Sequence, residues 1–146
     1  MTEESEDDLK RLDVELLVAH PAMDPDDITI ALGLEPSHAN RVGDDRTTPK
    51  GTPLPGQYPD TRWRHSVRHD VRGQHFHRPV ADLLDRLTPH KSFLTELRTS
   101  GGKATLIVQF LGDGYFGDTL PLDMLSRLVD LQLDLGLECY TVPQSP

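Results

Sequence analysis

Two histidines separated by one residue, His75 and His77, form the pattern in this sequence most typical of a metal site. If this tripeptide were extended, alternate side chains would project to one side and both imidazoles would face the same ion. His65 and His69 lie close enough in the sequence to join them. A metal site needs three or four ligands in the correct geometry, however, and Asp70 is the acidic residue of this stretch. His75 and His77 are therefore kept as candidate ligands, but we expect a solvent-exposed basic hairpin or loop here, with no metal and no other cofactor.

A tryptophan between two arginines forms a second pattern with binding chemistry. Guanidinium groups bind carboxylate or phosphate, and the ring of Trp63 could lie beside those of Arg62 and Arg64 as a flat contact surface. Strand alternation would place Trp63 and His65 on one face and the arginines on the other. The alternative is that the single tryptophan belongs to the core. The arginines would then face outward, toward an acidic partner or the chain's own acidic ends.

A third candidate lies in the turn after the first expected helix. Ser37, His38 and Arg41 combine a hydroxyl, an imidazole and a guanidinium that could hold an anion. Equally, Ser37 could cap a helical turn and Arg41 could pair with Glu35. The candidate residues for binding a ligand or a partner are therefore Arg41, Arg62, Trp63, Arg64 and His65.

No pattern in the sequence indicates a catalytic centre. Cys139 follows a glutamate in an expected strand, where no positive neighbour or helix start would lower the pKa of its thiol. The sequence contains no Gly-x-Ser-x-Gly elbow, His-Glu-x-x-His helix or phosphate-binding loop. The patterns lean against an enzyme without deciding the question.

The chain is acidic overall but not evenly so. Among 146 residues it has 24 acidic and 15 basic side chains, a formal net charge of −9. Residues 1–40 contain 11 acids and 2 bases, residues 41–103 contain 7 and 12, and residues 104–146 contain 6 and 1. This polarity can mark an interaction surface, or the three segments can meet in the fold and neutralise one another.

Composition also restricts the class of protein. An acidic chain lacks the basic footprint of a sequence-independent nucleic-acid binder, and its apolar runs are too short to cross a membrane. The acidic start differs from a signal peptide, and one cysteine permits no internal disulfide. We therefore expect a cytoplasmic protein that binds neither nucleic acid nor membrane.

Periodicity and turn residues indicate the elements that would position these side chains. A strand is expected from Asp13 to His20, and a helix from Asp24–Pro25 to Gly33. A loop rich in proline and glycine follows over about 33–60. The remaining pattern predicts a strand from Thr61 and then a helix from Pro79, which breaks before Pro89 and stops at Gly101–Gly102. After it we expect a strand at 103–111, a loop at 112–118, a helix from Pro121 and a strand to about Val142.

This order predicts one α+β domain over 13–142, preceded by a disordered acidic tail at 1–12. Its core would be a single mixed or antiparallel sheet of about four to five strands with helices on one face, possibly built as two strand-helix-strand units.

Several segments of the chain resemble a known bacterial family, the domain of unknown function 4279. The similarity rests on Asp24–Pro36 with its Leu-Gly-Leu-Glu-Pro ending, on Arg41-Val-Gly43, on Trp63 near a strand start, on the helix with Pro89, and on the closing Leu137-Glu-Cys-Tyr140. It covers about residues 13–142. The resemblance implies a single α+β domain and no particular reaction.

Two functions follow as expectations. The first is a non-enzymatic protein-interaction module of the immunity or accessory type, whose partner is another protein. The alternative is a small-molecule or metal-binding domain that uses the arginines and histidines of 62–78 with the loop at 33–46. Self-association through an exposed strand edge, giving a homo-oligomer, is compatible with both.

Overall fold

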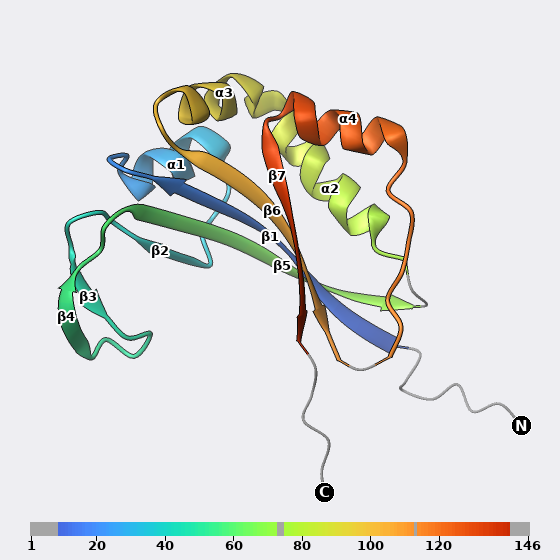
Figure 1. The fold of residues 1–146 in the computed structure, drawn as a ribbon, viewed down its shortest axis with the longest axis horizontal. Coiled ribbons are helices and arrows are strands. Elements are labelled where there is room, and N and C mark those ends of the chain that lie inside the picture. Colours follow the sequence, from blue (N-terminus) through green and yellow to red (C-terminus); the bar gives the residue numbers. More distant parts are fainter. Residues whose placement is uncertain (1–8, 73–74, 113, 141–146) are drawn as a thin grey trace, which may run out of the picture.

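The computed structural model describes residues 9–72, 75–112 and 114–140, in which helices cover one face of a five-stranded sheet (Figure 1). In chain order the elements are β1 (Leu9–His20), α1 (Pro25–Leu32), β2 (His38–Asn40), β3 (Asp45–Thr47), β4 (Pro53–Gln57), β5 (Thr61–Arg72), α2 (His77–Leu87), the 3₁₀ turn η2 (Thr88–His90), α3 (Lys91–Thr99), β6 (Lys103–Leu111), α4 (Leu122–Asp130) and β7 (Leu133–Tyr140). The α+β class with helices on one face is confirmed.

The sheet is mixed, with the strand order β2-β5-β1-β6-β7. Strands β5 and β6 both run antiparallel to the central β1, whereas β7 runs parallel to β6 through the crossover helix α4. Because β2 and β7 each have one neighbour, they form the two edges of this sheet.

Alternation along β1 explains why this strand is central. Leu12, Val14, Leu16 and Val18 are at most 1% exposed and face the helices. Opposite Val18 in the sheet lies Trp63 of β5, which is fully buried. Trp63 is therefore a core residue, and the hypothesis that its ring forms an exposed binding surface is wrong.

The first strand begins earlier than its sequence pattern predicts. β1 starts at Leu9, four residues before Asp13, because its antiparallel pairing with β5 continues to the Leu9–Arg72 pair. Residues 9–12, which we assigned to the acidic tail, therefore belong to the sheet. The rest of that tail, 1–8, lies outside the described residues.

The proline- and glycine-rich segment at 33–60 contains three short strands. β2 extends the main sheet beside β5, while β3 and β4 pair as a separate two-stranded sheet that projects from it (Figure 1). Gly51 adopts a φ of 87° in the connection between β3 and β4, a conformation that disfavours residues with a side chain. The Tyr58 hydroxyl hydrogen-bonds both the backbone N–H and the carbonyl of Thr47, 3.2 Å away in each case.

The broken helix has the expected form. The apolar positions of α2 (Val80, Leu83, Leu84 and Leu87) are buried, and the 3₁₀ turn at Thr88–His90 contains Pro89 and separates α2 from α3. Helix α2 nevertheless begins at His77, two residues before Pro79.

Candidate functional site

The arginines of β5 lie on the face of the sheet that carries no helix, where they pair with acidic side chains. Arg64 Nη1 lies 3.0 Å from Glu15 Oε2, and two nitrogens of Arg68 lie 2.9 and 3.2 Å from the carboxylate oxygens of Asp13. Arg62 Nε donates to Asp60 across 3.1 Å. Glu15 and Asp13 of the acidic N-terminal segment thus neutralise Arg64 and Arg68 of the basic centre, as the neutralisation alternative predicts.

Glu15 makes this open face unfavourable for an anionic ligand. Its side chain is almost completely buried, and burial raises the pKa of Glu15 even though the Arg64 guanidinium acts to lower it. The nearby Glu138 and Asp13 raise the same pKa further. Arg64 is already paired with Glu15, so it is not a free cation for an external carboxylate or phosphate.

Arg41 is likewise paired, at the β2 edge of the sheet. Its Nη2 lies 2.9 Å from Asp24 Oδ2 and 3.7 Å from Asp26, so the pairing with Glu35 that we considered does not occur. Asp24 accepts the backbone N–H of Asp26 at the start of α1, and this hydrogen bond and Arg41 together lower the pKa of Asp24. The anion site expected in this turn is therefore occupied by the chain's own carboxylates.

A polar cleft of about 430 Å³ surrounds Arg41, between the start of α1, β2 and the β3–β4 hairpin. Its charged lining includes Asp26, Asp44 and Asp45 in addition to Arg41. Ser37, from the same turn, neither points to a ligand nor caps a helix, because its hydroxyl accepts the backbone N–H of Ser66 at 3.0 Å. These contacts connect the turn to β5 and give it a structural role.

His65 faces the helices rather than the open face. Its Nδ1 lies 2.7 Å from the carbonyl oxygen of Glu35, and its ring stacks on Trp63 with 6.3 Å between the ring centres. Its Nε2 is buried and has no partner among the described residues. The structure therefore divides the five predicted site residues between the open face (Arg62, Arg64), the core side (Trp63, His65) and the β2 edge (Arg41), and they do not form one site.

His75 and His77 meet an acidic residue that the local sequence does not show. Asp118, from the loop between β6 and α4, places its carboxylate 3.2 Å from His75 Nδ1 and 2.5 Å from His77 Nδ1. One ligand atom from each residue falls within 4.8 Å of the other two. Of the expected hairpin or loop, the loop is found at His75, which is exposed, whereas His77 is already the first residue of α2.

The carboxylate of Asp118 acts as a helix cap. Phe76, at the cap position of α2, makes no side-chain cap, and Asp118 Oδ2 accepts the backbone N–H groups of Phe76 and His77 at 3.0 and 2.9 Å. Burial alone would raise the pKa of Asp118, but these bonds and the imidazoles hold it well below its usual range. The positive end of the helix dipole favours an anion and opposes a cation there. We therefore interpret this cluster as structural.

Many exposed apolar side chains lie on α4 and on β7, the strand at the other edge of the sheet. Among the described residues ten large apolar side chains are exposed, and seven of them lie between 115 and 140. Five of these seven form what we call the β7–α4 edge: Leu122, Leu125, Val129, Leu135 and Leu137. Leu122, Val129 and Leu137 are 82%, 75% and 60% exposed. The helical pattern of 121–130 and the alternation of 131–138 predict both elements. These patterns do not show that the side chains remain exposed in the fold.

Acidic residues surround the β7–α4 edge. Asp134 and Glu138 alternate with Leu135 and Leu137 along β7 and face the open side of the sheet. The one basic residue of α4, Arg127, is bound to Asp85 across 2.7 Å. Asp134 in turn lies 3.7 Å from Arg98 Nη2 of α3, so the negative charge that flanks the apolar surface is partly paired within the chain.

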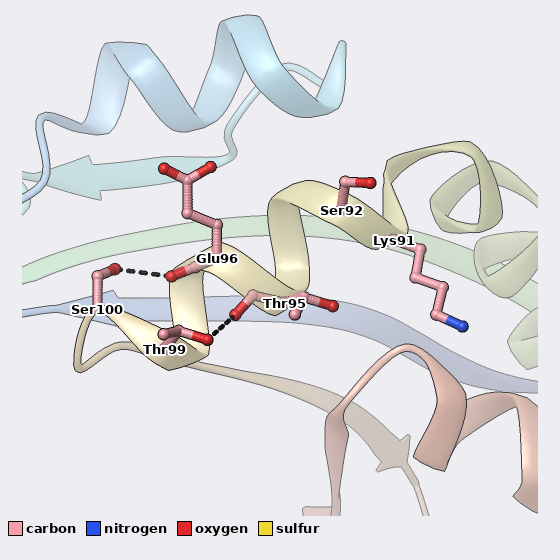
Figure 2. A pocket seen from close by; sticks show the side chains of 6 residues that line it. All are labelled: Lys91, Ser92, Thr95, Glu96, Thr99 and Ser100. Atoms are coloured by element: carbon pink, nitrogen blue, oxygen red, sulfur yellow. Dashed lines mark hydrogen bonds between the residues drawn. The ribbon is translucent and has the colours of Figure 1, made fainter.

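A hollow of about 450 Å³ runs along the outer side of α3 (Figure 2), where all six lining residues come from that one helix and its end. Thr99 and Ser100 donate their hydroxyls to the helix carbonyls of Thr95 and Glu96. Two of its four hydroxyls are therefore used within the helix, and we assign no ligand to this hollow.

The comparisons place the chain in a family. Residues 10–142 match the family described as "Domain of unknown function (DUF4279)", and the chain belongs to it. The most specific part of the resemblance, from Asp24 to Pro36, forms α1 and the turn that follows it. No curated protein and no solved structure matches the chain. Within the described ranges, no helix is long and apolar enough to span a membrane.

Proposed function

We propose that this protein is a non-enzymatic interaction module that binds an extended segment of another protein along the β7–α4 edge. The observation that carries the proposal is the exposure of Leu122, Val129 and Leu137 beside an edge strand. Proteins seldom leave such a strand both apolar and uncovered, because its free backbone groups pair with other chains.

The alternation of β7 specifies the partner's chemistry. A strand added to β7 would meet Leu135 and Leu137 on its helix-facing side and Asp134 and Glu138 on its other side. Side chains directly opposite each other in a sheet interact, and opposite charges stabilise the pair. The best partner is therefore a segment in which apolar residues alternate with lysine or arginine.

Charge disfavours a second copy as the occupant. The antiparallel pairing that places Leu135 opposite Leu137 of another copy also places Asp134 opposite Glu138. Like charges in directly opposed positions destabilise a sheet. A basic partner avoids this cost and also gains from the acidic surroundings of the edge.

An accessory or immunity role, in which binding itself is the activity, agrees with this surface. We also propose a cytoplasmic location, because Cys139 is an exposed free thiol, which suits a reducing compartment.

The rival function is the binding of an anion or small molecule by the arginines of 62–78 with the 33–46 loop. It has less support, because Arg41, Arg64 and Arg68 are already paired with carboxylates.

The test uses fluorescent peptides of defined pattern. We expect a short peptide with alternating valine and lysine to bind, and peptides with alternating valine and glutamate, or with valine and lysine in separate blocks, to bind much more weakly. Leu137→Asp or Val129→Asp should abolish binding. Ile30→Asp is the matched control, because Ile30 is a 79% exposed apolar residue on α1.

Two results would overturn the proposal. Absence of binding, or equal loss in the control variant, would remove the β7–α4 edge as the docking surface. A dimer detected by light scattering and lost in Leu137→Asp would assign the edge to a second copy.

A further inference from the structure

A small cavity of about 180 Å³ lies between β5 and α2, on the helix-covered side of the sheet. Its apolar lining consists of Val14, Val67, Pro79 and Leu83. Its polar lining consists of His65, His69, Asp82 and Arg86. Apolar walls with a few converging polar groups are the usual composition of a small-molecule site.

His65 presents an unused acceptor atom. Because a carbonyl oxygen can only accept, the 2.7 Å contact with Glu35 assigns the ring proton to Nδ1 and leaves a lone pair on Nε2. Nε2 is buried and has no partner among the described residues. Buried polar atoms are nearly always hydrogen-bonded, so a donor from outside the chain is the natural partner.

Asp82 and Arg86 add two charges of opposite sign. They lie one turn apart on α2, and neither makes a hydrogen bond or ion pair with the part of the chain that the structure describes. Arg86 thus differs from Arg41, Arg64 and Arg68, which are all paired with carboxylates. Arg86 and Asp82 are both exposed, so they line the cavity where it opens to solvent.

We propose that this cavity binds a small apolar α-amino acid. The ligand's ammonium group would donate to His65 Nε2 and to Asp82, its carboxylate would pair with Arg86, and its aliphatic side chain would lie against Val67 and Leu83. This assignment gives a partner to each of His65 Nε2, Asp82 and Arg86. A simple carboxylic acid would leave Asp82 facing a like charge, and a simple amine would leave Arg86 unpaired.

The size of the cavity agrees with such a ligand. Drug-sized molecules occupy about 300–1,000 Å³, whereas a cavity of about 150 Å³ holds benzene. At about 180 Å³ the cavity suits a molecule with the bulk of valine.

The test measures the binding of L-valine by ¹H–¹⁵N NMR of the full chain, observing the ring nitrogens of His65. We expect saturable shifts of His65 Nε2, and weaker binding of N-acetyl-L-valine, which lacks the ammonium group, and of L-valinamide, which lacks the carboxylate. Arg86→Gln should reduce the affinity for L-valine about tenfold or more while changing that for L-valinamide little. Arg78→Gln, on the same helix but away from the cavity, is the matched control and should leave both affinities unchanged.

His65→Gln supplies a second variant that acts on the ammonium side. It should weaken L-valine and L-valinamide alike, because both carry the ammonium group. The proposal is wrong if L-valine at about 10 mM leaves the His65 signals unchanged. It is equally wrong if the three ligands bind alike, or if Arg78→Gln weakens L-valine as much as Arg86→Gln does.

Discussion

The imidazole of His20 lies 2.9 Å from the hydroxyl of Ser100 and thereby joins the end of β1 to the end of α3, 80 residues further along the chain. On its other side, His20 Nδ1 accepts the backbone N–H groups of Ala22 and Met23, each at 2.9 Å. This buried histidine therefore organises the turn between β1 and α1, which contains the cap residue Asp24.

Replacing His20 should reduce stability more than a surface change would. We expect His20→Ala to lower the free energy of unfolding by about 2–3 kcal/mol, because two backbone N–H groups lose their acceptor. His20→Asn should recover part of this loss, since its amide oxygen can take the place of Nδ1. Urea unfolding followed by circular dichroism measures both, and an alanine variant as stable as wild type would contradict the assigned role.

Gly102 offers a steric test of the same corner. A Cβ at this position would lie 2.8 Å from the backbone oxygen of Ala19 and 2.7 Å from the His20 ring. We expect Gly102→Ala to cost about 1–3 kcal/mol through overpacking. Gly136→Ala is the control, because its Cβ would meet the side chain of Ile107 at 3.2 Å, which a small rotation relieves. Thermal unfolding of the two variants should show the larger loss for Gly102→Ala.

Glu15 should produce a measurable pH dependence. Because its pKa is raised in the folded state, its ionisation opposes folding, and that cost appears as the pH rises from the ordinary value near 4.5 through the raised pKa. Glu15→Gln should therefore be more stable than wild type at neutral pH, and the difference should shrink as the pH falls toward 4.5. Urea midpoints over this range measure it, and the exposed control Glu96→Gln reports the effect of removing any carboxylate. A Glu15→Gln variant that is less stable than wild type at neutral pH would instead show that the Arg64 pair dominates.

Zinc should not stabilise the protein through His75, His77 and Asp118. The Asp118 carboxylate already binds two backbone N–H groups of α2, and a cation would compete with them. We expect equimolar zinc to leave the melting temperature unchanged, and Asp118→Asn to lower stability by about 1 kcal/mol as a lost cap does. A zinc-induced rise in melting temperature that His75→Ala removes, and the control His90→Ala keeps, would instead establish a metal site.

Local patterns in the sequence were sufficient for much of the fold. The spacing of Val80, Leu83 and Leu87 identifies the buried side of α2, and Pro89 marks the break before α3. These features depend on residues within one or two turns of each other, where helical periodicity and proline sterics act.

The candidate sites depend on contacts that no local pattern contains. Asp118 meets His77 across 41 residues, and Glu15 meets Arg64 across 49. Such pairs follow from strand order and from the path of the β6–α4 loop, which periodicity does not specify. For the same reason the arginines of 62–78 have no evident partners in the sequence, whereas the fold pairs Arg62, Arg64 and Arg68 with carboxylates.

The parallel placement of β7 has a consequence for how the chain is made. Strands β5, β1 and β6 are complete at residue 111, whereas β7 joins the sheet only after α4 has crossed back over it. Until then β6 is the edge, and its buried residues Leu106 and Val108 lack their neighbours Leu135 and Leu137. Any folding intermediate that lacks β7 would expose β6, a more apolar edge strand than that of the finished protein, and such edges are prone to aggregate.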